Sequence, residues 1–425
     1  MRLKHLLAVG ILAAALGGST AIAGGVYTNG MPLAGGTQYP STLPLTGNEQ
    51  IPADTELSSG QAPQSEAITV GQMSGSDRTF TGSGGWRNSL IGGDFGTNPW
   101  AYGTTVASTA NTATYTANRW VAFSSSASGA VSVSKQTGAS DITTGYQASA
   151  RVSRDGGNTN TGAMCMAQEV ESANSYRFQG STAEFVSHLL AGSGFSAASS
   201  QVSMKIITGT GTDEGTASLA AGTWTGQATA VSRLTTISAT WGRYSAVATI
   251  PAAATEIAVE ICFTPVGTAT IFDYFEFTGA QLDVNPNAVA NTVMSSFERR
   301  PTGTEQALAA RYYQSLAEPG KYPASLGSGG AQSTQSCFVW VALPVVMRST
   351  PTVTTSTGTF NIIQATGTAG VAITTGNAYF GAMAVQNLQS VGVIATAAQY
   401  GIKLGGPCSL GGGGGTGYIA ASAEL

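Results

Sequence analysis

The sequence predicts an all-β, multidomain protein, and three observations carry that prediction. Apolar and polar residues alternate with a period of two in many short runs, and turns containing glycine or asparagine separate these runs, which is the pattern of half-buried strands. Glycine occurs 56 times, and charged residues make up only 9% of the chain, against roughly a quarter in ordinary soluble domains. The charged residues that sustain surface helices are therefore scarce. At 425 residues the chain is too long for one small core, so we expect two or three domains.

The first segment, residues 1–24, has the pattern of a secretory signal. Arg2 and Lys4 precede an apolar run over 6–16, and small residues follow, ending in Ala21-Ile22-Ala23, which has the small-x-small pattern of a cleavage site. The run is too short for a standard transmembrane helix, so we expect no stable membrane insertion. Two interpretations stay open: the segment is removed from a secreted or periplasmic protein, or it is retained as an apolar anchor helix.

Residues 25–78 are rich in Pro, Gly, Ser and Thr and have few apolar runs, which predicts an extended arm that gains order by packing on something else. Residues 79–290 follow with regularly spaced alternating runs, which predict a jelly-roll-like β-sandwich. The runs expected to form its strands are 130–134, 148–153, 202–207, 244–250, 257–263 and 274–282.

A linker over 291–318 contains the clearest helix signal of the chain outside its first segment. Thr302 and Glu305 have the spacing of a capping box, and the Ala/Leu-rich run predicts a short helix over 304–313. Residues 319–425 are expected to form a smaller C-terminal β-sandwich. The strands expected there are 337–346, 350–355, 378–385, 391–395 and 417–420. No fixed-period repeat is present, which argues against a β-helix or a propeller.

Composition excludes several classes of function. The net charge is −4 with no Lys/Arg cluster, which disfavours nucleic-acid binding. The glycine runs lack the following helix and lysine of a phosphate-binding loop, so we expect no cofactor. Such a weakly charged surface is a solubility risk for a monomer, and we expect identical neighbours to cover much of it.

The four cysteines are too few and too scattered for a disulfide framework or a zinc site. They are Cys165, Cys262, Cys337 and Cys408. One bridge in each large segment stays open, but buried free thiols are the preferred interpretation.

The sequence predicts no catalytic residue, no metal site and no enzyme. The chain has two histidines: His5 belongs to the first segment, and His188 stands in an apolar strand, where a packed histidine is more common than a general base. Glycan hydrolysis needs two carboxyl groups across a cleft. The candidate pairs are Glu169 with Glu171, Glu256 with Glu260, and Asp273 with Glu276. For the first two pairs, alternation on the solvent side of a strand explains the spacing.

Aromatic rings could form a platform for a sugar, since a ring face stacks on the apolar face of a pyranose. Trp100, Tyr102 and Trp224 lie in Gly/Thr-rich contexts typical of surface loops and are the candidate carbohydrate-binding residues. Trp120 and Trp340 stand among apolar residues, and we expect both in the core.

Three stretches resemble structural proteins of bacteriophages. Residues 45–66, with Leu45, Glu49, Pro52, Asp54 and Pro63, resemble the N-terminal virion-anchoring arm of short-tailed phage proteins. The block over 93–120 is similar to the carbohydrate-binding-module-like sandwich of tail fibres. The most specific stretch, Phe297-Glu298-Arg299-Arg300-Pro301 leading into Arg311-Tyr312-Tyr313, resembles a junction that precedes a small C-terminal β domain in fibre proteins. The resemblance covers roughly 43–313 and the closing 423–425. It departs at 187–191, where the family has an aromatic-Ala-Arg-Ala strand, and at Thr302, where it has a tyrosine.

The resemblance implies a homotrimeric or otherwise oligomeric tail fibre or receptor-binding appendage located in the virion. Its arm would dock to other tail or virion proteins, and its β-sandwich modules would contact a host-surface glycan. The alternatives are a secreted or periplasmic bacterial carbohydrate-binding protein, a glycan depolymerase tailspike, and a head decoration fibre.

Overall fold

The computed structural model describes residues 50–55, 64–69, 86–96, 105–108, 112–117, 119–125, 131–317, 327–333, 336–355, 361–363, 365–366, 371–372, 378–387, 390–397, 406–411 and 419–423. The chain divides into two compact units, Met1–Gly84 and Gly85–Leu425. In the first unit, β1 (Gln50–Thr55) and β2 (Gln64–Thr69) pair antiparallel, so the predicted arm contains a short ladder. The segment 1–24 lies outside the described residues. No helix in the part of the chain described is both long and apolar enough to cross a membrane.

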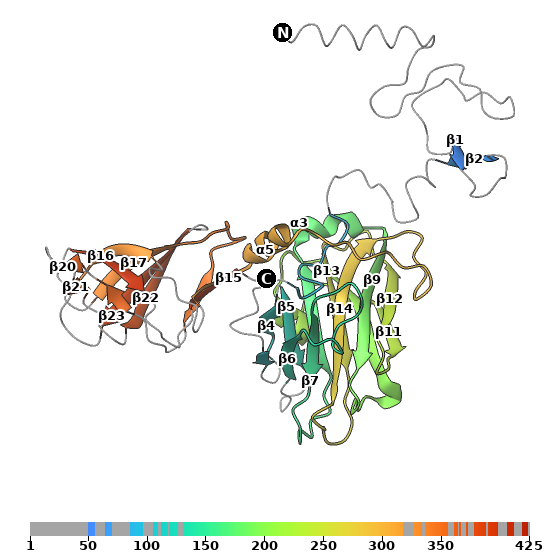
Figure 1. Ribbon diagram of the computed structural model, residues 1–425, viewed down its shortest axis with the longest axis horizontal. Coiled ribbons are helices and arrows are strands. Elements are labelled where there is room, and N and C mark those ends of the chain that lie inside the picture. Colours follow the sequence, from blue (N-terminus) through green and yellow to red (C-terminus); the bar gives the residue numbers. More distant parts are fainter. Residues whose placement is uncertain are drawn as a thin grey trace, which may run out of the picture. The chain divides into compact units, whose positions relative to one another are not determined.

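The second unit contains a sandwich of two six-stranded antiparallel sheets (Figure 1). In spatial order, sheet A consists of β11 (Ala228–Thr236), β10 (Gln201–Gly209), β13 (Glu256–Phe263), β8 (Met164–Val170), β5 (Trp120–Ser124) and β4 (Thr114–Ala117). Sheet B consists of β12 (Gly242–Thr249), β9 (Thr182–Ala191), β14 (Tyr274–Val284), β7 (Ser149–Ser153), β6 (Val131–Gln136) and β3 (Thr105–Ser108). All six runs predicted as strands of this module form strands. The all-β prediction is therefore confirmed.

The core lies between the two sheets and is rich in aromatic rings. Phe95, Trp120 and Phe277 are each fully buried, with ring centroids 4.8 to 5.8 Å apart. Trp120 is thus in the core, as predicted. Phe95 reaches the core because Gly93 lets the chain pass close to β14: a Cβ at Gly93 would lie 2.1 Å from the carbonyl oxygen of Ala280.

The outer face of sheet A carries a second buried cluster. Val121, Ile207 and Ala258 pack there under Leu219 of α4 (Thr216–Ala221) and under Trp224. This cover explains why outward residues of β8 and β13 are buried, and β13 is buried along its whole length. The prediction that Glu169, Glu256 and Glu260 alternate toward solvent is therefore wrong, because each is at most 4% exposed.

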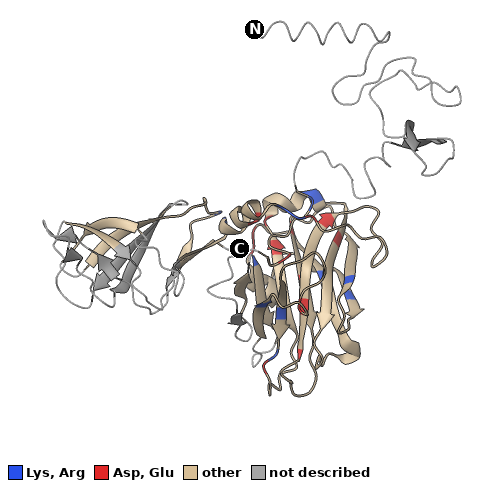
Figure 2. Ribbon diagram, viewed as in Figure 1, with Lys and Arg blue, Asp and Glu red and all other residues tan. Residues whose placement is uncertain are grey.

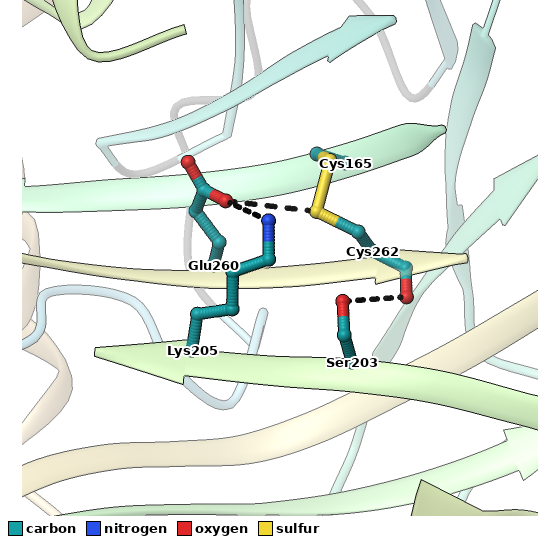
Figure 3. Close-up of a disulfide and its surroundings, with 5 residues drawn as sticks. All are labelled: Cys165, Ser203, Lys205, Glu260 and Cys262. Carbon is teal, nitrogen blue, oxygen red and sulfur yellow. Dashed lines mark hydrogen bonds and ion pairs between the residues drawn. A yellow bond between two sulfur atoms is a disulfide. The ribbon is translucent and has the colours of Figure 1, made fainter. Parts of the chain in front are cut away.

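The cysteines form two disulfides, and the preference for free thiols is wrong. Cys165 of β8 is bonded to Cys262 of β13 (Figure 3). These residues are direct partners in the antiparallel register. Both cysteines pack in the same cluster as Leu219 of α4. The second bridge joins Cys337 to Cys408. These cysteines lie on β17 (Ser336–Ala342) and β24 (Pro407–Gly411), which flank β16 (Gly327–Ala331) in the C-terminal sheet. Each large β region therefore contains one covalent cross-link.

Residues 285–300, which we call the strap, follow β14 and cross the outer face of sheet B. The backbone N–H and hydroxyl of Ser295 donate to Glu184 of β9 at 3.0 and 2.9 Å. The backbone N–H of Glu298 donates to Gln281 of β14 at 2.6 Å. These bonds hold the strap against the sheet and direct it into the linking helix.

The linking helix α5 spans Thr302–Ala310 and lies near α3 (Ser172–Ser175) at one end of the sandwich (Figure 1). It begins two residues earlier than predicted, and Tyr313 already starts the next strand. The capping box is wrong as well, because Pro301 is the N-cap and makes no side-chain cap bond. Two 3₁₀ turns, η1 (Tyr176–Phe178) and η2 (Ala198–Ser200), complete the described helical elements of this region.

The C-terminal region is built from three further sheets. A three-stranded sheet consists of β15 (Tyr313–Ala317), β25 (Ile419–Ser422) and β18 (Thr352–Thr355). A six-stranded sheet consists of β19 (Asn361–Ile363), β24 (Pro407–Gly411), β16 (Gly327–Ala331), β17 (Ser336–Ala342), β23 (Ser390–Ala397) and β22 (Ala378–Asn387). The strands β20 (Ala365–Thr366) and β21 (Val371–Ala372) form a two-stranded ladder. Every predicted C-terminal run contains a strand, and the exact domain boundaries stay a prediction.

Candidate functional site

A cavity of about 310 Å³ lies where the strap enters α5. We call it the junction pocket. Its lining comes from three separate parts of the sequence: the segment 88–96, the loop before β7, and the strap with the start of α5. The lining residues are Asn88, Asp94, Gly96, Gln147, Phe297, Glu298, Arg299, Arg300, Thr302 and Glu305. Four of these lining residues, Phe297 to Arg300, belong to the junction motif singled out in the sequence.

Buried polar contacts fix the inner wall of the pocket. Arg300 is 8% exposed and donates to Glu305 at 2.8 Å and to the carbonyls of Asn88 and Leu90 at 2.6 and 2.7 Å. Glu305 also accepts a hydrogen bond from the backbone N–H of Gly92. Burial raises the pKa of Glu305, and Arg300 opposes that rise. This ion pair explains why Glu305 does not cap the helix: its carboxylate is used to hold the segment 88–92 in place.

The wall formed by the strap is held by a second set of bonds. The Glu298 carboxylate accepts a hydrogen bond from the backbone N–H of Asn88 at 2.8 Å. The Asn88 side chain donates to Ala280 at 3.2 Å and accepts from Leu282 at 3.1 Å. The bonds of Asn88 and Glu298 join three parts of the chain into one network: the segment around Asn88, strand β14 and the strap. The pocket is thus built on a rigid support, which is what a binding site requires.

The outer part of the pocket combines charges with aromatic rings. The guanidinium of Arg299 lies 3.7 Å from the Asp94 carboxylate, and the Arg299 side chain is 48% exposed. It also lies over the Tyr146 ring, 5.4 Å from the centroid. Phe297 lines the pocket and packs against the same ring at 5.5 Å. A ligand entering here meets Arg299 as an exposed polar group, Asp94 as a partly buried one and Phe297 as an apolar surface.

The pocket can therefore bind a small polar molecule through planar hydrogen-bonding groups and one ring. Carboxylate, amide and guanidinium groups each offer two atoms in one plane, which suits paired contacts to neighbouring hydroxyls. A concave site of roughly 300 Å³ or more with a few convergent polar groups is the usual form of a small-molecule site.

Of the three predicted carbohydrate-binding residues, Trp224 alone lies in the described part of the chain. Trp224 is 4% exposed, because it packs under α4 and donates from Nε1 to the Gly215 carbonyl at 3.2 Å. The expectation that its ring is on the surface is wrong. Trp100 and Tyr102 lie outside the described residues, so their role stays a prediction. Trp340, expected in the core, is 42% exposed, which is a further correction.

The arm residues proposed to anchor the chain are described only in part. Pro52 and Asp54 lie in β1, opposite Ala67 and Ser65 of β2. Leu45, Glu49 and Pro63 lie outside the described residues. Virion anchoring by the arm therefore stays a prediction.

The carboxylate pairs singled out in the sequence are used in internal contacts. Glu171 accepts hydrogen bonds from Arg311 and Tyr312 at 2.8 and 2.9 Å. Asp273 forms an ion pair with Arg154 at 2.6 Å, and both side chains are fully buried. Glu276 is held by Arg151 at 2.6 Å.

The remaining members of those pairs lie on sheet A. Glu256 accepts the backbone N–H of Glu214 at 2.6 Å, and burial raises its pKa. Glu260 pairs with Lys205 at 3.0 Å beside the disulfide (Figure 3). None of the three candidate pairs lines the junction pocket.

His188 and a possible metal site can be placed as well. His188 is half-buried on β9 and packs against Tyr146, with ring centroids 5.1 Å apart. Burial and the nearby Arg243 lower its pKa to about 4. Among the described residues, one group has metal-ligand spacing, Cys165, Glu260 and Cys262. Its two sulfur atoms are bonded to one another, whereas a metal needs deprotonated thiols, so this group does not suit a metal ion.

No protein-family model and no curated protein matches the chain. Among solved structures it is similar to a family 4 carbohydrate-binding module (CBM4) at 14% identity, covering 34% of this chain and 73% of that chain with a TM-score of 0.23. The C-terminal family 22 carbohydrate-binding module of Clostridium thermocellum Xyn10B matches at 17% identity, covering 40% of this chain and 89% of that one, with a TM-score of 0.25.

A phage protein is also among the structures that match. It is the enzymatically active domain of tailspike protein 4 of bacteriophage CBA120, at 9% identity, covering 46% of this chain and 21% of that chain with a TM-score of 0.28. At these identities and TM-scores the similarities carry no argument about function.

Proposed function

We propose that the chain is a virion appendage protein, a tail fibre or receptor-binding protein, that binds a host-surface glycan in the junction pocket. One observation carries the glycan-binding part: Phe297, Arg299, Asp94 and Gln147 all line one cavity of about 310 Å³. A sugar ring has hydroxyls around its edge and C–H groups on its faces. Planar polar side chains beside an aromatic ring complement both features.

The virion part of the proposal rests on the sequence. The arm over 45–66 and the junction over 297–313 resemble fibre proteins. The surface is also poor in charge, with 9% charged residues along the whole chain, and self-association would cover part of it. A homotrimer docked to other virion proteins by its arm accounts for both observations. The molar mass of the purified protein, measured by light scattering after size exclusion, tests this part. A trimer is expected, and a monomer would favour the secreted or periplasmic carbohydrate-binding alternative.

The glycan-binding part is tested with the full chain on an array of neutral and acidic oligosaccharides. Arg299→Ala and Gln147→Ala should each reduce binding to the recognised glycans at least tenfold, because both side chains line the pocket and are exposed. Arg233→Ala is the matched control, since Arg233 lies on β11 of the other sheet. Equal binding by wild type and both pocket variants would show that the pocket is not the glycan site.

A second candidate function, glycan hydrolysis, is favoured by the three carboxylates that line the pocket, Asp94, Glu298 and Glu305. Hydrolysis requires one protonated and one ionised carboxyl group facing the substrate. Glu305 and Glu298 are already held by Arg300 and by the Asn88 backbone, and we therefore propose binding without turnover. Release of reducing ends from a bound polysaccharide, lost in Glu305→Gln, would establish hydrolysis instead.

A further inference from the structure

Strand β17 of the C-terminal sheet presents two aromatic rings on its outward face. Its inward residues Cys337, Val339 and Val341 are at most 3% exposed. Between them, Phe338 is half-buried and Trp340 is 42% exposed. Since residues two apart point to the same face of a strand, the two rings share one side of the sheet.

The neighbours of Trp340 across the sheet are all small. In the antiparallel register Trp340 pairs with Ser328 of β16, and Ser328 pairs with Ser409 of β24. On the other side Trp340 pairs with Gly392 of β23, and Gly392 pairs with Ala384 of β22. Residues opposite one another in a ladder share a face. Trp340 is thus flanked in the ladder by a serine on one side and a glycine on the other.

The surface of the sheet beside Phe338 is not covered by other side chains of the described residues. Phe338 pairs with Gly330 of β16, and a Cβ placed at Gly330 would meet no atom within 4 Å. The rings of Phe338 and Trp340 are perpendicular, with an interplanar angle of 88° and centroids 5.0 Å apart. They form a corner, which we call the aromatic corner: one ring can lie under a flat ligand while the other borders its edge.

The residues around the aromatic corner are uncharged. Between residues 327 and 423 the chain has two charged residues, Arg348 and Lys403, and neither belongs to a strand of the six-stranded sheet. The described strands of this sheet are free of blue and red in Figure 2. The polar group offered beside Trp340 is the exposed hydroxyl of Ser328. A charged ligand would find no counter-ion on these strands.

The corner is also too small for a stable protein interface. Two partly exposed rings offer apolar area on the order of 200 Å², whereas a stable interface buries roughly 800 Å² on each partner. The small residues on either side add little further apolar surface. A pyranose, with one apolar face and a polar edge, matches two rings bordered by a hydroxyl.

We propose that the aromatic corner of Phe338 and Trp340 binds a neutral pyranose glycan, as a second carbohydrate site on the C-terminal β region. The site shares no residue with the junction pocket, so the two can be tested separately. Its polar contact comes from the exposed hydroxyl of Ser328 on β16. The face of the sugar stacks on one ring, and its edge contacts the other.

The test uses the full chain with 5-fluorotryptophan at its six tryptophans and follows their ¹⁹F resonances. The Trp340 signal is assigned by its absence in Trp340→Phe. The ligands are hexasaccharides of glucose, mannose and galactose at millimolar concentration, with a sialylated hexasaccharide as the acidic comparison. Trp86→Phe is the matched control, because Trp86 is 45% exposed and lies outside the corner.

A saturable shift of the Trp340 resonance with at least one neutral hexasaccharide is expected. The dissociation constant should rise at least tenfold in Phe338→Ala and be unchanged in Arg299→Ala, which alters the junction pocket alone. The inference is overturned if no neutral hexasaccharide shifts Trp340, or if the acidic one alone does. It is also overturned if Trp340→Phe lowers the molar mass of the native oligomer, since the corner would then be a contact between copies of the chain.

Discussion

The hydroxyl of Tyr312 donates a hydrogen bond of 2.9 Å to the Glu171 carboxylate, which joins the residue before β15 to the end of β8. Both residues are buried. Arg119 lies over the Tyr312 ring at 3.9 Å from its centroid, and Arg311 donates to the other carboxylate oxygen at 2.8 Å. The junction that resembles fibre proteins therefore closes on the sandwich through one buried carboxylate.

Tyr312→Phe should destabilise the protein by about 1.5–3 kcal/mol, because it removes a buried hydrogen bond to a carboxylate and leaves that oxygen of Glu171 with only the longer bond of 3.4 Å from Asn174. Urea unfolding measures this loss. Tyr176→Phe, at a residue that is 64% exposed, is the control and should change stability by about 0.5 kcal/mol or less. Equal stability of both variants would mean that water replaces the hydroxyl and that the junction is not closed.

Asp283 and Glu184 stand opposite one another on β14 and β9 under the strap. Within the described part of the chain, neither Asp283 Oδ1 nor Glu184 Oε1 has a hydrogen-bond partner. Burial raises the pKa of Asp283 from 3.8 to about 6, and the Glu184 carboxylate adds to the rise. Because the folded-state pKa is raised, folding favours the protonated acid. The stabilising contribution is complete below about pH 4 and is lost as the pH rises through 6.

Asp283→Asn should therefore be more stable than wild type at pH 7, by up to about 3 kcal/mol, and similar to it at pH 4. The amide cannot ionise and can donate to Glu184. Urea unfolding of both proteins from pH 4 to pH 7.5 gives the difference at each pH. Asp155→Asn, at an exposed carboxylate, should show no such trend. A variant that is less stable than wild type at pH 7 would indicate that the Asp283 charge is paired with a cation.

The strands of the sandwich could be predicted because one face of each strand is always buried against the other sheet. The outer faces could not, because the segments that cover them are distant in sequence. The alternation in β13 predicts that Glu260 points to solvent, yet α4 and Trp224 cover that outer face of sheet A. Trp340 reads as core among its apolar neighbours in sequence, but its neighbours across the sheet are serine and glycine.

The junction pocket shows the same limit. Phe297 and Arg299 could be singled out through the resemblance at the junction. That Asp94 and Gln147 meet them could not be predicted, since these two residues precede Arg299 by 205 and 152 positions and reach the strap only in three dimensions. No local pattern distinguishes either residue from an ordinary polar residue in a turn.

Arg154 is the largest fully buried charged side chain among the described residues. Its removal should strongly lower the free energy of unfolding. It pairs with Asp273 at 2.6 Å and donates to the carbonyls of Asn160, Gly267 and Val266 at 2.7 to 3.1 Å. Arg154→Ala leaves the Asp273 charge buried without its cation, which costs about 3–5 kcal/mol. The loss is measured by urea unfolding, with Arg233→Ala as the control. If both variants lose the same small amount, the buried pair does not hold the loop before β14.

The two disulfides close long loops, with sequence separations of 97 and 71 residues. Loops of this length predict a contribution of about 4–5 kcal/mol each through the entropy of the unfolded chain. Because all four cysteines are bonded in these two bridges, iodoacetamide treatment of the unreduced, unfolded protein should alkylate no cysteine. Mass spectrometry measures the number of alkylated cysteines directly.

The size of each contribution is measured on the double variants Cys165→Ala/Cys262→Ala and Cys337→Ala/Cys408→Ala. Cys165 and Cys262 also pack in the cluster under α4, so the first variant loses side-chain volume as well as the cross-link. Reduced wild-type protein keeps that volume and loses the bonds alone, and it separates the two effects. We expect the reduced protein to lose most of the stability that the double variants lose. Full stability after reduction, or alkylation of all four cysteines without reductant, would show that the chain folds with free thiols.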